Sequence, residues 1–126
     1  MKRNKFITAS LVSLAVACGL TSCAQPEPEK EIGLKDVYEG KFLIGTALNQ
    51  WQVAGADSMA IETVKKHFNA IVAENCMKNG PMHPTEGNFE FKDADAFVQF
   101  GVDNGLTVTG HCLIWHSQLA PWFCFD

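Results

Sequence analysis

The sequence lacks the residue spacings that bind zinc. Its five cysteines include no CxxC pair, and its four histidines form no HExxH motif, although protein zinc sites are commonly built from such closely spaced ligands. Two cysteines fall within the first 23 residues, which leaves an odd set of three: Cys76, Cys112 and Cys124. We therefore expect no metal and no other cofactor. We favour buried free thiols over a Cys76 to Cys112 disulfide, which an oxidising compartment would permit.

Basic residues are also scarce. The chain has ten lysines and arginines against fourteen aspartates and glutamates, and three of the ten lie in residues 1–22. Without those residues, seven basic and fourteen acidic side chains leave a formal charge of −7. Nucleic acid binding needs a basic cluster that neutralises phosphates, and this sequence has none. A neutral polysaccharide makes no such demand on charge.

No apolar run is long enough to span a membrane. The run from Phe6 to Gly19 is shorter than the roughly 20 residues that a spanning helix needs. Lysines and an arginine precede it and Leu20-Thr21-Ser22-Cys23 follows, the order typical of a secretion signal. The last four residues resemble the lipobox of bacterial lipoproteins. We expect residues 1–22 to be a lipoprotein signal peptide and Cys23 to be lipidated, with Cys18 or a plain signal peptide as alternatives.

This signal predicts attachment to a membrane. Residues 23–33 are polar, contain proline and glutamate, and show no apolar periodicity, so we expect an extended tether. The lipid on Cys23 would hold the exported protein on the periplasmic or outer-membrane surface of a Gram-negative bacterium. Residues 34–126 would form the folded part.

Apolar patterns in the folded part alternate between strand and helix periods. Strands are predicted over residues 42–48, 70–73 and 107–113. A helix capped by Asp57 or Ser58 follows the first strand, and a second helix runs from Asp93 to a stop at Asn104-Gly105, after a loop over 79–88. Strands that alternate with helices form βαβ units on a parallel sheet, so the predicted class is α/β.

Polar and aromatic side chains follow the second and third predicted strands. Glu74, Asn75 and Lys78 come after the second strand, and strand alternation would place His111 and Trp115 on one face of the third. Parallel strands end at one edge of a sheet, so these groups would gather there. Polar groups at the edge of a pyranose and an indole against its face form a sugar site. Taken alone, a histidine beside a tryptophan is more often a core pair than a ligand site.

Four segments in this order resemble family 10 of the glycoside hydrolases, the endo-β-1,4-xylanases. They are Gly45-Thr46-Ala47, Glu74-Asn75 with Met77-Lys78, Gly87-x-Phe89-x-Phe91, and Gly110-His111-x-Leu113-x-Trp115-His116-Ser117-Gln118. The resemblance implies a (β/α)8 TIM barrel that hydrolyses xylan with retention. Such hydrolysis uses two glutamates about 5 to 5.5 Å apart, one as acid/base and one as nucleophile.

The same resemblance implies roles for the residues at the strand ends. Residues that match the family's sugar contacts are Glu74, Asn75, Lys78, His111 and Trp115. His116 and Gln118 match its motif as supporting residues. The implied partner is xylan or a xylo-oligosaccharide. Trp51 and Trp122 are each either an exposed platform for a sugar or a packing residue.

Length limits how much of a barrel this chain can form. Eight βα units need roughly 250 residues, whereas residues 23–126 number 104 and contain three predicted strands. We therefore expect the first three βα units of a TIM barrel, incomplete in this chain. The family's catalytic glutamates follow the fourth and seventh strands, so we expect neither here. We also expect the 126-residue chain alone to be inactive and poorly stable.

Two other functions are compatible with these patterns. A noncatalytic surface glycan-binding lipoprotein would keep the sugar contacts and lack the glutamates downstream. A structural or adhesive lipoprotein would use the aromatic residues only as core. The second is disfavoured because it gives no reason for polar groups to gather at the strand ends.

Overall fold

The computed structural model describes residues 31–124, so the predicted signal peptide, Cys23 and most of the predicted tether lie outside the described part. In chain order the elements are α1 (Leu34–Val37), β1 (Gly45–Leu48), η1 (Gln52–Ala56), α2 (Ser58–His67), β2 (Ala70–Ala73), α3 (Asn79–Met82), α4 (Lys92–Asp103), β3 (Thr107–Thr109) and η2 (Pro121–Phe123). Within residues 31–124, no helix has the length and apolar character needed to cross a membrane.

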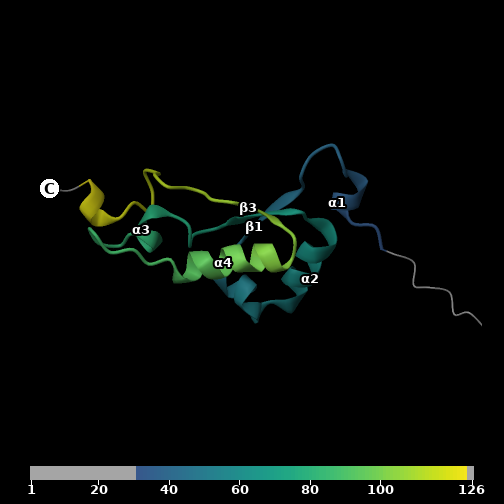
Figure 1. The fold of residues 1–126 in the computed structure, drawn as a ribbon, viewed down its shortest axis with the longest axis horizontal. Helices are drawn as coiled ribbons and strands as arrows, with labels where there is room; N and C mark the ends of the chain where they lie inside the picture. Colours follow the sequence, from purple (N-terminus) through teal and green to yellow (C-terminus); the bar gives the residue numbers. More distant parts are fainter. Residues whose placement is uncertain (1–30, 125–126) are drawn as a thin grey trace, which may run out of the picture.

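The three strands form one parallel sheet in the order β1-β2-β3. Ala70 of β2 is in register with Gly45 of β1 on one side and with Thr107 of β3 on the other. Along the long axis of the molecule, α1 lies at one end, and α3 lies near the C-terminus at the other (Figure 1). The chain runs from α1 through β1, and from β2 to α3, so the strands end on the α3 side. The predicted parallel α/β arrangement is confirmed.

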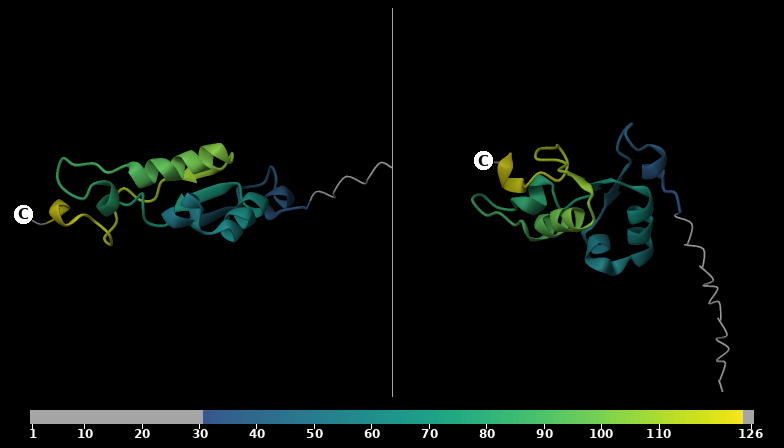
Figure 2. Two further views of the ribbon diagram at one scale, coloured as in Figure 1. Left: turned by 90° about the horizontal axis from the view of Figure 1, so that it is seen from below. Right: turned by 45° about the vertical axis from the view of Figure 1, so that its right-hand side comes forward.

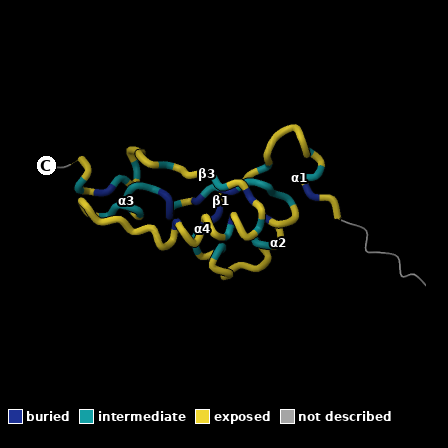
Figure 3. Tube along the Cα trace, in the orientation of Figure 1, coloured by how far each residue is buried: buried dark blue, intermediate teal, exposed yellow. Residues whose placement is uncertain are grey.

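The core lies where α4 packs against the sheet. Phe97 of α4 and Ile71 of β2 are almost completely inaccessible to solvent, and both belong to one buried cluster. Burial of side chains this large stabilises a fold by roughly 1.5 to 3 kcal/mol each. Buried segments follow the strands and the chain beside them, whereas much of the outer surface of the helices is exposed (Figure 3). From α2, Val64 contributes to the same cluster.

The predicted helix boundaries agree closely with the structure. Asp57 caps α2, because its Oδ1 accepts a hydrogen bond from the backbone N–H of Ala60 at 3.0 Å. Helix α4 begins one residue before the predicted start and ends at the predicted Asn104-Gly105 stop, where Gly105 adopts a φ of 63°. A positive φ suits glycine, because glycine has no Cβ to clash with the backbone.

Two predicted strands are too long. The first begins at Gly45 rather than at residue 42, and β3 ends at Thr109 rather than at residue 113. Thr109 pairs with Val72, and β2 stops one residue later, so the chain beyond Gly110 has no neighbouring backbone in the described sheet. The expectation that strand alternation would place His111 and Trp115 on one face is therefore wrong.

Short helices also occupy segments in which no helix is predicted. The region after β1 contains η1, and the predicted loop over 79–88 begins with α3. Helix α3 spans only four residues, and α1 spans four residues in a segment without a predicted element. Single turns of helix carry too few residues to show an apolar period. Figure 2 shows α1 and α3 towards opposite ends of the molecule.

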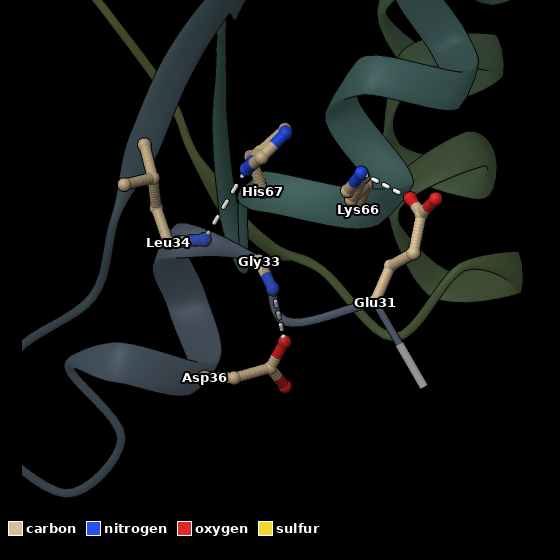
Figure 4. A network of polar contacts seen from close by, with 6 residues as sticks. All are labelled: Glu31, Gly33, Leu34, Asp36, Lys66 and His67. Atoms are coloured by element: carbon tan, nitrogen blue, oxygen red, sulfur yellow. Dashed lines mark hydrogen bonds and ion pairs between the residues drawn. The ribbon is translucent and has the colours of Figure 1, made fainter. Parts of the chain in front are cut away.

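The first described residues are held against the end of α2 (Figure 4). The backbone N–H of Leu34 donates to Nδ1 of His67 at 3.2 Å, and the backbone N–H of Gly33 donates to Oδ2 of Asp36 at 2.7 Å. Glu31 pairs with Lys66, and the hydrogen bond and charge of Lys66 hold the pKa of that carboxyl below its usual range. These contacts fix where the chain joins the folded part.

Gly101 sets how closely α4 approaches β3. A Cβ at this position would lie 2.2 Å from Cγ2 of Val108, so Gly101→Ala forces the helix or the valine to move. Overpacking costs about 1 to 3 kcal/mol and better helix propensity regains about 1 kcal/mol, so we expect the free energy of unfolding to fall by up to about 2 kcal/mol. Urea unfolding followed by circular dichroism measures the loss.

Two further variants test this explanation. Val102→Ala, at an exposed position of the same helix, should change stability by no more than about 0.5 kcal/mol. Val108→Ala should restore part of the stability lost in Gly101→Ala, because it removes the clashing methyl group. If Gly101→Ala is at least as stable as the original protein, close packing at this glycine is not a constraint.

Candidate functional site

A cavity of about 570 Å³ lies along the strands and reaches their carboxyl ends. Its floor is formed by backbone and small or apolar side chains of β1 and β2. Three of the predicted sugar contacts line it: Glu74, Lys78 and His111. Glu74 continues the sheet, since its backbone N–H donates to the carbonyl of Leu48 at 2.9 Å. An anionic, a cationic and an imidazole side chain therefore share one cavity, although His111 does not lie on a strand.

The carboxamide of Asn75 connects the two loops of the site. Its Oδ1 accepts a hydrogen bond from Nζ of Lys78 at 3.1 Å and another from Nε2 of Gln118 at 3.0 Å. Lys78 belongs to the loop after β2, and Gln118 to the segment after β3. Both lone pairs of one amide oxygen are therefore used to position two side chains. A backbone hydrogen bond also closes a turn in the loop after β2, because the N–H of Lys78 donates to the carbonyl of Asn75 at 2.9 Å.

Trp115 lies beside this network. Nζ of Lys78 is 4.8 Å from the centroid of the indole, within the range of a cation–π interaction. The ring of His116 meets the indole edge to face at a centroid distance of 5.1 Å. Trp115 is 38% exposed, so part of its ring remains accessible to a ligand. The structure thus brings Lys78 into contact with both Asn75 and Trp115.

Two residues that the sequence did not single out hold the second loop in place. The backbone N–H of Gly80 donates to the carbonyl of Gln118 at 2.9 Å, and the N–H of Ala120 donates to Oδ1 of Asn79 at 2.8 Å. A Cβ on Gly80 would lie 2.9 Å from the Gln118 carbonyl oxygen, so this contact requires glycine or a shift of the loop. The Asn79-Gly80 pair was a weak signal, since in sequence it indicates only a turn.

The cysteines near the site are free thiols. Cys76 is buried and Cys112 partly buried, and no disulfide joins them. Cys124, which was not part of that expectation, is exposed. Burial raises the pKa of the Cys76 thiol, and the negative charge of Asp93 raises it further.

Trp122 and Trp51, the tryptophans without a predicted role, differ in their surroundings. Trp122 donates from Nε1 to the carbonyl of His83 at 2.9 Å and meets that imidazole edge to face at 4.5 Å. It is therefore a packing residue. Trp51 is 69% exposed.

Comparison with known proteins identifies the family. Residues 33–126 match Glycosyl hydrolase family 10. The chain belongs to this family. The match includes both loops of the site, with Asn75, Lys78, Trp115 and Gln118.

Several relatives of this family 10 chain are named xylanases. It is 41% identical over 107 residues to endo-1,4-beta-xylanase A of Xylanibacter ruminicola. This match covers 85% of the chain and 28% of that protein. It is 38% identical over 122 residues to the thermostable celloxylanase of Thermoclostridium stercorarium, covering 96% of the chain and 30% of that protein. The chain thus spans less than a third of the length of these curated relatives.

Solved structures show the same fold. Xylanase B from Clostridium stercorarium F9 superposes with a TM-score of 0.69 at 40% identity, covering 76% of this chain and 27% of that one. A variant of xylanase 10C from Cellvibrio japonicus, in complex with xylopentaose, gives a TM-score of 0.67 at 40% identity, covering 73% and 19%. The described strands and helices are the first βα units of a (β/α)8 barrel, incomplete in this chain. The individual roles of the site residues stay predictions.

The buried thiol next to Asn75 provides a test of the local structure. In a variant whose only cysteine is Cys76, we expect a thiol reagent at neutral pH to react at least about tenfold more slowly with the folded protein than in denaturant, because burial lowers both the thiolate fraction and access. The raised pKa also means that stability falls as pH rises above about 8.5, where the unfolded thiol ionises.

Asp93→Asn serves as the matched variant. It removes the second cause of the raised pKa, so it should shift the pH dependence of the Cys76 reaction to lower pH without exposing the thiol. Equal reaction rates in the folded protein and in denaturant would show that Cys76 is accessible and that this part of the site is described wrongly.

Proposed function

We propose that this chain is the amino-terminal part of a longer endo-β-1,4-xylanase, and that it binds the xylan chain on one side of the bond that is broken. The observation that carries the proposal is the Asn75 network, which holds Lys78 against the indole of Trp115 at the rim of the cavity. Support also comes from the relatives, which are named xylanases, and from a similar structure solved with xylopentaose.

The side chains offer complementary chemistry to a pentose ring. Glu74 presents carboxylate acceptors, and the ammonium of Lys78 keeps donors beyond the one bound to Asn75. Trp115 supplies a flat apolar face next to these polar groups, the arrangement that suits a ring with hydroxyls at its edge. His111 lines the same cavity as Glu74 and Lys78. All of these residues bind and orient the sugar, and none of them is the acid/base or the nucleophile.

The catalytic step would need residues outside this chain. Retaining hydrolysis uses two carboxyl groups about 5 to 5.5 Å apart, one protonating the leaving oxygen and the other attacking the sugar carbon. The resemblance places both glutamates after later strands. The whole protein should therefore release reducing sugar from xylan, and the purified 126-residue chain should release none above a buffer blank, because positioning alone does not replace the two carboxyl groups.

This result also separates the proposal from its alternative. A whole protein that binds xylan without hydrolysing it would be the noncatalytic glycan-binding lipoprotein. Release of reducing sugar by the 126-residue chain itself would mean that the catalytic groups are among the residues described above, and the assignment of Glu74 to binding would be wrong.

Lys78→Ala and His111→Ala should lower kcat/KM on xylo-oligosaccharides in different ways. By the family resemblance His111 contacts the sugar at the cleavage subsite. A contact there strengthens as the ring approaches the transition state, so the loss for His111→Ala should fall mainly on kcat. We expect about 1.5 to 3 kcal/mol, which is roughly ten to 150-fold in rate. Lys78 would contact a sugar further from the bond, in ground and transition states alike, so its loss should fall mainly on KM.

Lys65→Ala, an exposed lysine on α2, is the control and should match the original enzyme. Melting temperatures must be compared for all three variants, since Lys78 also holds the Asn75 network together. If Lys78→Ala and His111→Ala keep both melting temperature and activity within a factor of two, these residues do not bind the substrate.

We also propose that the protein is exported and anchored to a membrane through lipidated Cys23. The order of basic residues, apolar run and Leu20-Thr21-Ser22-Cys23 supports this proposal. In a bacterium with an intact lipoprotein pathway, the product should fractionate with membranes and incorporate labelled fatty acid, and Cys23→Ser should abolish the label. Cys18→Ser is the matched control and should keep it. Equal labelling of the original protein and Cys23→Ser would place the lipid elsewhere.

A further inference from the structure

Trp51 borders a second cavity that is separate from the site described above. This cavity has a volume of about 430 Å³ and lies between the segment around η1 and the start of α4. Its lining residues are Gln50, Trp51, Val53, Ala54, Lys92, Asp93 and Ala96. None of them lines the first cavity. Both walls are formed by described residues.

Trp51 lies on a hydrogen-bonded turn with its side chain exposed to solvent. On one side, Asn49 and Gln52 are joined by two reciprocal hydrogen bonds, from each backbone N–H to the side-chain oxygen of the other, at 3.1 and 3.0 Å. On the other side, Val53 packs against the hydrophobic core. The indole is therefore presented on an anchored turn, which limits the conformational entropy lost when a ligand binds it.

The polar residues around the indole are available to a ligand. Within residues 31–124, no hydrogen bond or salt bridge engages the side chains of Gln50, Lys92 or Asp93. Together they offer amide, ammonium and carboxylate groups beside a flat apolar ring, which is the chemistry that binds a pyranose. Lys92 and Asp93 carry opposite charges, so the surface favours a neutral ligand over a polyanion.

We propose that Trp51 and this cavity form a secondary binding site for a neutral β-linked polysaccharide, distinct from the cleavage site. The sugar would stack on the indole and hydrogen-bond to Gln50, Lys92 and Asp93. The identity of that polysaccharide as xylan rests on the proposed function. Segment η1 follows β1, and α4 follows the loop after β2, so a polymer held here would lie near the loops that hold the first site.

Binding of the whole protein to soluble xylan, measured by affinity electrophoresis, tests the proposal. Trp51→Ala should raise the dissociation constant by about three- to tenfold, the range for loss of an aromatic stacking contact. Trp51→Phe should keep most of the affinity, because it retains a ring. Val102→Ala, exposed on the outer side of α4, should bind like the original protein. Hydrolysis of xylotriose, too short to occupy both sites, should not change in Trp51→Ala.

The outcomes separate this site from the proposed activity. If the original protein binds xylan through Trp51 but hydrolyses no xylo-oligosaccharide, the secondary site stands and the proposed function fails. If Trp51→Ala binds xylan as tightly as the original protein, or if neither binds it, the secondary site is overturned. A lower melting temperature with equal losses on xylan and xylotriose would show that Trp51 is a structural residue, which also overturns the proposal.

Discussion

The two loops of the candidate site depend on one amide oxygen. Oδ1 of Asn75 accepts from Lys78 and from Gln118, which are 40 residues apart in sequence and follow different strands. Lys78 in turn lies over the indole of Trp115. Because an amide oxygen has two lone pairs, both are engaged within the protein, and Asn75 can offer only its N–H donors to a sugar. The geometry of the site therefore depends on Asn75, whose side-chain N–H groups stay available to a sugar.

The long elements could be predicted from sequence because their signals are local. Apolar spacing and the Asn104-Gly105 stop located α4, and Asp57 located the start of α2. The end of β3 could not be read in this way, because a strand lasts only while a neighbouring backbone pairs with it, and β2 stops at Ala73. The apolar pattern of one strand does not show where the strand paired with it ends.

The sequence predicted which residues form the site, but not how the loops hold them together. Family resemblance indicated which residues contact sugar, and the structure gathers Glu74, Lys78 and His111 on one cavity. The predicted reason for that grouping, alternation along a strand, was wrong for His111. The links made by Gly80 and Asn79 join segments about 40 residues apart, so no local pattern could reveal them. What the sequence could not supply was the set of contacts between loops.

The central claim is that this chain supplies the sugar-binding loops of a family 10 xylanase. A crystal structure of the whole protein soaked with xylotriose tests it most directly. We expect a xylose ring with its hydroxyls within hydrogen-bonding distance of Glu74 and Lys78, and the indole of Trp115 lining the neighbouring cleavage subsite. Electron density for the sugar elsewhere, with this cavity filled only by protein side chains, would contradict the claim.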